Sequence, residues 1–242
     1  MNRARTGMQG FTLMEIAIVM VVIGLLAGGS LAALRAHQLR AQHAATRDAL
    51  EEARQALFHH AVLHGRVPCP AKSPIDGEAE APGNNGCPRN RGLLPWATLG
   101  VQGLDGWHNR LSYIASSELT RQEGISLSVQ PGNGITLNTR DPAGNQQTLA
   151  TAKAVAFALW SHGSNGHGAV SAAGTLIADA SDSNHDEDTN TWQGSGNTVY
   201  ARDPTDNSAV SGGEFDDIVV WGSYYVLIGR LLAAGQLSQA SP

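Results

Sequence analysis

Charged residues are scarce in this chain of 242 residues, at 15% of the sequence, and the formal net charge is only −5. A cytosolic enzyme usually carries more charge than this. Residues 1–10 hold Arg3 and Arg5 and no acid, so the chain from Phe11 onward keeps 14 of the 16 basic residues against all 21 acidic ones, a net charge of −7. This balance gives no support for a strongly basic surface, and we expect no nucleic-acid partner.

Cysteine is nearly absent, since the chain contains only Cys69 and Cys87. An even number near one loop suits a single disulfide formed in an oxidising compartment. A metal site is the alternative, but the third and fourth ligands that it needs do not accompany the pair in sequence. We therefore expect a Cys69–Cys87 disulfide, which would stabilise a loop of this size by roughly 3 kcal/mol.

Motifs of the common enzyme classes are missing as well. The sequence has no phosphate-binding loop and no dinucleotide fingerprint. Ser164 follows His162 and Gly163, but this is not the Gly-x-Ser-x-Gly turn of hydrolases, because here the glycine is adjacent to the serine. The pair His59-His60 fits no standard zinc spacing and is expected to lie on the surface or to cap a helix. We expect no enzymatic activity.

Apolar residues are concentrated near the N-terminus. Residues 16–34 read IAIVMVVIGLLAGGSLAAL, a run without any charged side chain. A helix of this length can cross a bilayer, and the run is longer than the apolar part of a secretory signal peptide. We therefore predict a transmembrane segment over residues 11–34.

One acid, Glu15, stands at the edge of this run, four residues after Phe11. An ionised carboxylate in lipid costs roughly several kcal/mol unless it is paired. Cleavage of the chain after Gly10 would create a partner at the same depth, the amino group of Phe11. In a helical assembly, Glu15 of one subunit would neutralise that amine on a neighbour and help to set the subunit register.

The string Gly10-Phe11-Thr12-Leu13-Met14-Glu15 and the apolar run after it resemble the processing site of type IV pilins and type II secretion pseudopilins. The resemblance implies that a prepilin peptidase cuts between Gly10 and Phe11 and methylates the new N-terminus. An ordinary membrane anchor is the alternative, but it has no need of this Gly, Phe and Glu at this spacing. Many pilins have a proline late in the apolar segment, where this chain has Ala32, and Gly28-Gly29-Ser30 is expected to weaken the helix instead.

The helix is expected to continue beyond the apolar run. Residues at three- and four-residue spacings form an apolar stripe: Leu39, Thr46, Leu50, Ala53, Leu57 and Ala61. Gly65 and Pro68 are expected to end the helix. We thus predict a leader at 1–10, a helix over 11–64 that is amphipathic over 35–64, and a globular head over 65–242. The fold class is α+β, a long N-terminal helix packed on a head with an antiparallel β-sheet, as in type IV pilins.

The head begins with a loop rich in proline and glycine, residues 65–106. Strands are expected after it at Leu111–Ala115, Ile125–Val129, Ile135–Leu137 and Ile218–Trp221, with Asn133-Gly134 as a hairpin turn. Lys153–Trp160 is expected to be a buried strand or a short helix, and Tyr224–Ala234 a helix. Four strings of the head resemble a group of large minor-pilin-like proteins: Pro68-Cys69-Pro70-Ala71, Gly92-Leu93-Leu94-Pro95-Trp96, Ser161-His162-Gly163 and Phe215-Asp216-Asp217-Ile218-Val219.

Residues 179–190 form the most acidic stretch. Four of them alternate as at the start of a calcium loop: Asp182, Asn184, Asp186 and Asp188. Glu187 stands where such a loop needs glycine and Gln193 where its closing glutamate should be, so the segment is not an EF-hand. We expect either a looser structural calcium site, to which Asp216 and Asp217 are candidates to add a ligand, or a solvated acidic loop. No other cofactor is expected.

These features predict a structural subunit, a minor pilin or a pseudopilin. It would sit in the inner membrane as a single-pass protein with its head in the periplasm. Its partners would be the prepilin peptidase and then other pilins or pseudopilins, bound through the N-terminal helix in a type IV pilus or a type II secretion pseudopilus. The alternative is a binding module displayed on such a filament, an adhesin or a DNA-uptake subunit.

Overall fold

The structure, a computed structural model, describes residues 11–127, 131–132, 134–194 and 196–237, and within these it describes no side chain of residues 26–32. The predicted leader, residues 1–10, lies outside the described residues. The chain divides into two compact units, Met1–Gln42 and His43–Pro242. Its fold class is α+β, with an N-terminal helix and an antiparallel sheet.

The N-terminal helix, α1, runs from Leu13 to His64 and belongs to both units. It ends where the sequence predicts, because Gly65 has a φ of 69°. Glycine takes up this left-handed conformation at the end of a helix without the clash that a Cβ would cause.

Within the first unit, the apolar side chains at the start of α1 are exposed. Phe11 is 84% exposed, Leu13 89% and Leu25 74%. Across the residues that the structure describes, none of the helices combines the length and the apolar character that a membrane crossing requires. The predicted transmembrane segment, residues 11–34, includes residues 26–32, whose side chains lie outside the described residues.

The second unit contains two sheets. The larger has the strand order β1-β2-β5-β7 and is antiparallel throughout. Its strands are β1 (Arg91–Leu93), β2 (Ser112–Ala115), β5 (Val155–Ser161) and β7 (Ile218–Ser223). The smaller has the order β4-β3-β6, in which β3 (Thr136–Arg140) pairs antiparallel with β4 (Gln146–Ala150) and parallel with β6 (Thr198–Tyr200).

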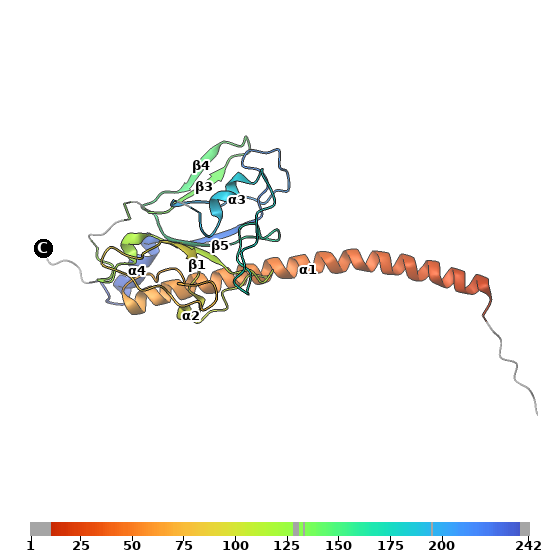
Figure 1. Ribbon diagram of the computed structural model, residues 1–242, viewed down its shortest axis with the longest axis horizontal. Helices are drawn as coiled ribbons and strands as arrows, with labels where there is room; N and C mark the ends of the chain where they lie inside the picture. Colours follow the sequence, from red (N-terminus) through yellow and green to blue (C-terminus); the bar gives the residue numbers. More distant parts are fainter. Residues whose placement is uncertain (1–10, 128–130, 133, 195, 238–242) are drawn as a thin grey trace, which may run out of the picture. The chain divides into compact units, whose positions relative to one another are not determined.

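Helices cover one face of the larger sheet, and the smaller sheet covers the other (Figure 1). The covering helices are the second part of α1 and α4 (Tyr224–Ala233). Two short helices, α2 (Trp96–Leu99) and α3 (His185–Asn190), and a 3₁₀ turn at Ser117–Leu119 lie in the connections. The second unit is therefore a three-layer structure.

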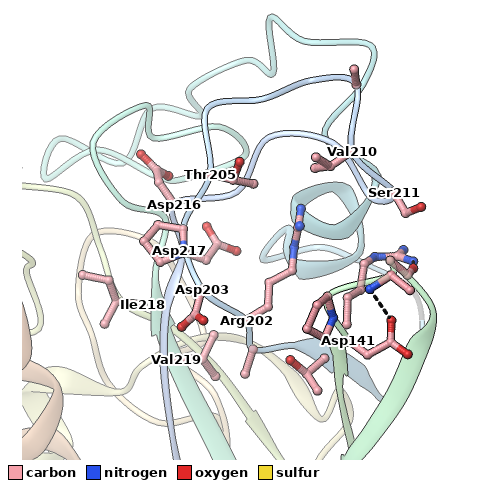
Figure 2. A pocket seen from close by; sticks show the side chains of 18 of the residues that line it. Asp141, Arg202, Asp203, Thr205, Val210, Ser211, Asp216, Asp217, Ile218 and Val219 are labelled. Carbon is pink, nitrogen blue, oxygen red and sulfur yellow. Dashed lines mark hydrogen bonds between the residues drawn. The ribbon is translucent and has the colours of Figure 1, made fainter.

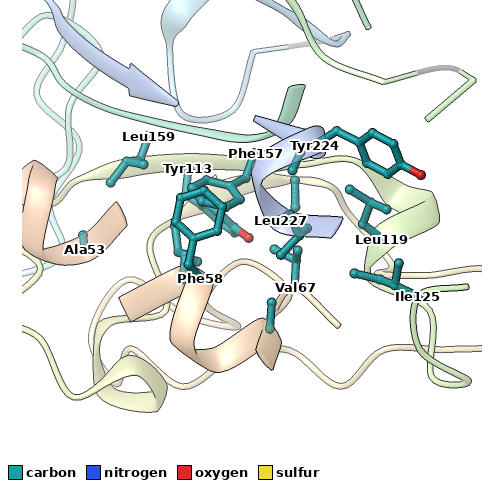
Figure 3. Packing of buried hydrophobic residues seen from close by; sticks show 14 of the residues in the cluster. Ala53, Phe58, Val67, Tyr113, Leu119, Ile125, Phe157, Leu159, Tyr224 and Leu227 are labelled. Carbon is teal, nitrogen blue, oxygen red and sulfur yellow. The ribbon is translucent and has the colours of Figure 1, made fainter. Parts of the chain in front are cut away.

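The main core lies between the helices and the larger sheet (Figure 3). Phe58 of α1 and Leu227 of α4 meet Tyr113 of β2 and Phe157 of β5, and all four are buried. The apolar stripe that the sequence predicts on α1 is buried from Thr46 onward, whereas Leu39 is 49% exposed. The predicted packing of the amphipathic part of the helix on the head is thus confirmed for residues 46–61.

A second core lies between the two sheets. Ala158 and Trp160 of β5 point to it together with Ile114 of β2, and they meet Leu137 of β3 and Val199 of β6. Because successive side chains of a strand point to opposite faces, β5 is buried on both, and each of its residues is buried. This explains why Lys153–Trp160 reads as a continuous apolar run, and the structure resolves it as a strand.

The sequence predicts a hairpin in which Ile125–Val129 pairs with Ile135–Leu137 across a turn at Asn133-Gly134. In the structure β3 pairs with β4 and β6 instead, and Ile125 lies outside any strand. The N–H of Ile125 donates to the Gly65 carbonyl at 2.7 Å, and its side chain packs in the main core, so Ile125 itself is anchored next to the end of α1. Val129 and Asn133, which the prediction also uses, lie outside the described residues.

Candidate functional site

The N-terminal candidate site begins with a helix cap. The hydroxyl of Thr12 accepts a hydrogen bond from the N–H of Glu15 at 3.2 Å, and the Glu15 carboxylate accepts one from the N–H of Thr12 at 3.0 Å. This reciprocal pair is a capping box, which satisfies two backbone donors that the first turn of a helix leaves without partners. Gly10, the residue before the predicted cleavage, lies outside the described residues, and Phe11 is exposed.

Glu15 has no charged partner among the residues that the structure describes. Its carboxylate is bonded by the N–H and the hydroxyl of Thr12, both at 3.0 Å. Local hydrogen bonds with Thr12 therefore fix the side chain.

The two cysteines are joined. Cys69 and Cys87 form a disulfide with a Cα–Cα separation of 5.5 Å, which confirms the predicted pairing. The bridge closes a loop over a sequence separation of 18 residues, just before β1. It therefore restrains the irregular segment that leads from α1 into the larger sheet.

The four predicted calcium ligands lie in and beside α3. Asp182 and Asp188 are exposed, whereas Asn184 and Asp186 are buried. The carboxylate of Asp186 is bound by the guanidinium groups of Arg140, at 2.6 Å, and Arg202, at 3.0 Å. Among the described residues, these aspartates do not form a group close enough to share one cation.

A different set of acids converges instead, which we call the Glu187 cluster: Glu187, Asp216 and Asp217. Each offers a carboxylate oxygen, and these atoms lie within 4.8 Å of one another. Glu187 comes from α3, and the two aspartates directly precede β7. Glu187 joins the two segments, because its Oε1 accepts the N–H of Asp216 at 2.6 Å.

The turn after β5 holds Asp216 in place. Its Oδ2 accepts hydrogen bonds from the N–H and the hydroxyl of Ser164, both at 2.8 Å, and from the N–H of Asn165 at 3.0 Å. Gly163 has a φ of 59°, and a Cβ on it would lie 2.1 Å from Oδ1 of Asp216. Only glycine allows this approach. The strings Ser161-His162-Gly163 and Phe215-Asp216-Asp217, far apart in sequence, thus form one site.

Burial and mutual repulsion govern the charges of the cluster. Burial, followed by the charge of Glu187, raises the pKa of Asp217 well above its usual value. Burial, opposed by the hydrogen bonds that Glu187 accepts, also raises the pKa of Glu187. Asp217 keeps one strong contact, because its Oδ2 accepts the side-chain N–H of Asn190 at 2.7 Å. The surroundings therefore disfavour ionisation of both Glu187 and Asp217.

A buried histidine adjoins the cluster. Nε2 of His162 lies 2.7 Å from the hydroxyl of Ser112, and its Nδ1 lies 3.9 Å from Oδ1 of Asp217. Burial lowers the pKa of His162 to about 3, so the ring is neutral at physiological pH. Serine, histidine and aspartate are the residue types of a hydrolase triad, but Ser112 is fully buried, and no substrate reaches its hydroxyl in this conformation.

The cluster borders a cleft of about 1100 Å³ (Figure 2). Asp216 and Asp217 line one side of it, and the side chain of Arg202 extends into it. The turns at Asp141 and at Val210-Ser211 form other parts of the rim. The cluster therefore lies at the edge of an open cleft.

The sequence draws attention to all three members of the Glu187 cluster, but not as one site. Glu187 stands out because it departs from the pattern of a calcium loop, and Asp216 and Asp217 are candidates to add a calcium ligand from elsewhere in the fold. The sequence does not bring the three together, because nothing in it indicates that α3 packs beside the start of β7. The Ser112–His162 contact depends on the pairing of β2 with β5, which no local pattern encodes.

Comparisons with known protein families, curated proteins and solved structures give no match to this chain.

Proposed function

We propose that this chain is a structural subunit of a type IV pilin-like filament, a minor pilin or a pseudopilin. The observation that carries the proposal is the sequence string from Gly10 to Glu15, whose last three residues begin α1. It is followed by exposed apolar side chains from Ile16 to Leu25, which no other described residues cover. Exposed apolar surface of this extent is typical of a segment that packs against lipid or other subunits.

In this proposal the subunit is first processed in the membrane and then assembled into a filament. It inserts into the inner membrane through residues 11–34 with its head in the periplasm, and a prepilin peptidase cuts it between Gly10 and Phe11. It then joins other pilins or pseudopilins through the N-terminal helix in a pilus or pseudopilus. Glu15 supports this sequence of events, because Thr12 holds its carboxylate in place at the start of α1, where the amine that cleavage creates on a neighbouring subunit would neutralise it.

The capping box allows the charge of Glu15 to be tested separately from its hydrogen bonds. Glu15→Gln keeps a side-chain acceptor for the N–H of Thr12 and removes the charge, whereas Glu15→Ala removes both. Thr12→Ala is the matched control, since it removes the hydroxyl half of the box and leaves the charge in place. Each variant is expressed in cells of the source organism, and mass spectrometry determines its N-terminus. Filaments sheared from the cells are then probed for the subunit.

The proposal expects a mature N-terminus at Phe11 for the wild type and for all three variants. It expects Glu15→Gln and Glu15→Ala to be depleted from filaments by about tenfold or more, because an unpaired amine would remain in an apolar environment, and Thr12→Ala to be incorporated. A wild-type chain that keeps Met1 would refute the processing step. Normal incorporation of Glu15→Gln would refute the charge pairing and leave Glu15 with a capping role alone.

A further inference from the structure

The Glu187 cluster contains two carboxylate oxygens that no described residue satisfies. Oδ1 of Asp216 and Oδ1 of Asp217 are both inaccessible to solvent and accept no hydrogen bond from the described chain. The side chain of Asp217 is only 1% exposed. Buried acceptors without a donor are rare in folded proteins, since each one costs the energy of its lost hydration. Each of these residues directs its other oxygen to protein donors, so both side chains are well fixed.

Nearby basic groups do not neutralise the cluster. The guanidinium groups of Arg140 and Arg202 both contact Asp186, although Arg202 also partly offsets the charge of Asp217. Nδ1 of His162 faces Oδ1 of Asp217 only at 3.9 Å. His167 approaches Glu187 only at 3.8 Å and lies closer, at 3.1 Å, to Asp179. Among the described residues, no arginine or lysine therefore forms an ion pair with the three carboxylates of the cluster.

We propose that Glu187, Asp216 and Asp217 bind a hard divalent cation, with Ca²⁺ as the preferred ion. The three ligand atoms lie within 4.8 Å of one another, and a calcium ion with ligands at about 2.3–2.6 Å bridges oxygens at such separations. All three donors are carboxylate oxygens, which favour Ca²⁺ or Mg²⁺ over zinc or copper. Water would have to enter from the adjoining cleft to complete the coordination.

The cation would join two segments that are distant in sequence and, through Asp216, would be connected to a third. Glu187 lies on α3, Asp216 and Asp217 precede β7, and the turn Gly163-Ser164-Asn165 holds Asp216 from the end of β5. Binding would therefore tie α3 and its acidic loop to the larger sheet. It would act as a structural crosslink in the head, independent of how the N-terminal helix is processed.

The matched variants replace one oxygen at a time. Asp217→Asn can keep its acceptor toward Asn190, and Asp216→Asn can keep its acceptor toward Ser164 and Asn165, so both preserve the local hydrogen bonds. Asp182→Asn is the control, because Asp182 is exposed and belongs to the alternating acids that sequence alone suggests as calcium ligands. The purified full-length protein is stripped with a chelator and titrated with CaCl₂ by calorimetry. Its Tm is measured with chelator and with about 5 mM CaCl₂, a concentration suited to extracellular calcium sites.

The proposal expects calcium to bind the wild type and the Asp182→Asn variant and to raise the Tm of both. Asp217→Asn and Asp216→Asn should bind at least about tenfold more weakly, because each loses a charged ligand. In chelator, Asp217→Asn should melt at a higher temperature than the wild type, since it removes a repelled buried charge. If one of the two variants, Asp216→Asn or Asp217→Asn, fails to fold, it is excluded. The proposal is then tested by comparing calcium binding of the wild type with that of the other variant.

Three results would overturn the proposal. Absence of heat and of any Tm change in the wild type with Ca²⁺ up to about 10 mM, well above the range of extracellular calcium sites, would mean that protons, and no cation, relieve the repulsion. Unchanged calcium binding in Asp216→Asn and Asp217→Asn would place the ion elsewhere. Loss of binding in Asp182→Asn alone would assign calcium to the alternating acids of residues 182–188. Parallel titrations with MgCl₂ and MnCl₂ test the ion preference, and binding of either without Ca²⁺ would contradict it.

Discussion

The carboxylate of Asp186 and the guanidinium of Arg140 form a bidentate ion pair, with Nε–Oδ2 at 2.7 Å and Nη2–Oδ1 at 2.6 Å. The side chain of Asp186 is 1% exposed, and Nε of Arg202 adds a third contact at 3.0 Å. This pair links α3 to β3 of the smaller sheet. Two arginines thus contact Asp186, the most buried of the alternating acids, and these acids do not converge on one point in the described structure.

Replacing Asp186 by asparagine should destabilise the head. The variant leaves Arg140 and Arg202 facing each other without a counter-ion, and removal of one partner of a buried pair costs about 3 kcal/mol. Urea unfolding of the full chain measures the loss. The control is Asp188→Asn, whose side chain is 51% exposed and which should change stability by less than about 0.5 kcal/mol. Equal effects of the two substitutions would show that the ion pair is not a structural link.

The Cys69–Cys87 disulfide should be a major source of stability. It closes a loop over 18 residues, which restricts the unfolded chain, and the double variant Cys69→Ala/Cys87→Ala should lose about 3 kcal/mol. Denaturant unfolding of the variant and of the wild type measures the difference. Reductant provides the control, since it should lower the midpoint of the wild type and leave the variant unchanged. A variant with the midpoint of the oxidised wild type would contradict this role.

Elements with a strong local signal could be predicted from the sequence. The apolar stripe on α1 and the stop at Gly65 follow from helical spacing and from glycine chemistry. β2, β5, β7 and α4 are apolar runs long enough to be recognised, and each lies within a few residues of its expected range. The disulfide follows because only two cysteines exist.

The rest depends on contacts between distant segments. β4 reads Gln146-Gln147-Thr148-Leu149-Ala150, a polar strand at a sheet edge, and β1 has only three residues inside a loop rich in glycine and proline. Arg91 in β1 is buried and donates to the carbonyls of Thr189 and Thr191 near the end of α3. The spacing of residues in the sequence does not predict that a buried arginine donates its hydrogen bonds to backbone carbonyls about a hundred residues away. The Glu187 cluster is hidden for the same reason, since its members meet only after the sheets pack.

Leu57 and Leu63 of α1 test how the second part of the helix packs on the head. Leu57 is fully buried in the main core, whereas Leu63 is 74% exposed. Leu57→Ala should therefore cost about 2–5 kcal/mol, from lost apolar contact and from the cavity left behind. Leu63→Ala should stay within about 0.5 kcal/mol of the wild type. Thermal unfolding of the full chain measures both, and similar Tm values for the two variants would contradict the packing of α1.

His60 should make stability depend on pH. Burial, followed by repulsion from His64, lowers the pKa of His60 in the folded protein to about 4, below its usual value of 6.5. Between these values the unfolded chain binds a proton that the folded chain does not. The free energy of unfolding should therefore fall as the pH drops from about 6.5 to about 4, and the effect should vanish above about 6.5.

The variant His60→Gln isolates this contribution, because glutamine does not titrate and can still donate to the Arg66 carbonyl, which Nδ1 of His60 approaches at 3.3 Å. Urea unfolding is measured between about pH 7 and pH 5 in chelator, where the variant should lose less stability than the wild type. The difference in slope should be below about 1.4 kcal/mol per pH unit, the limit for one proton, because the ring is only partly buried. His59→Gln, at an exposed position, is the control and should follow the wild type. Parallel curves for the wild type and His60→Gln would show that His60 takes up its proton equally well in the folded and unfolded chains.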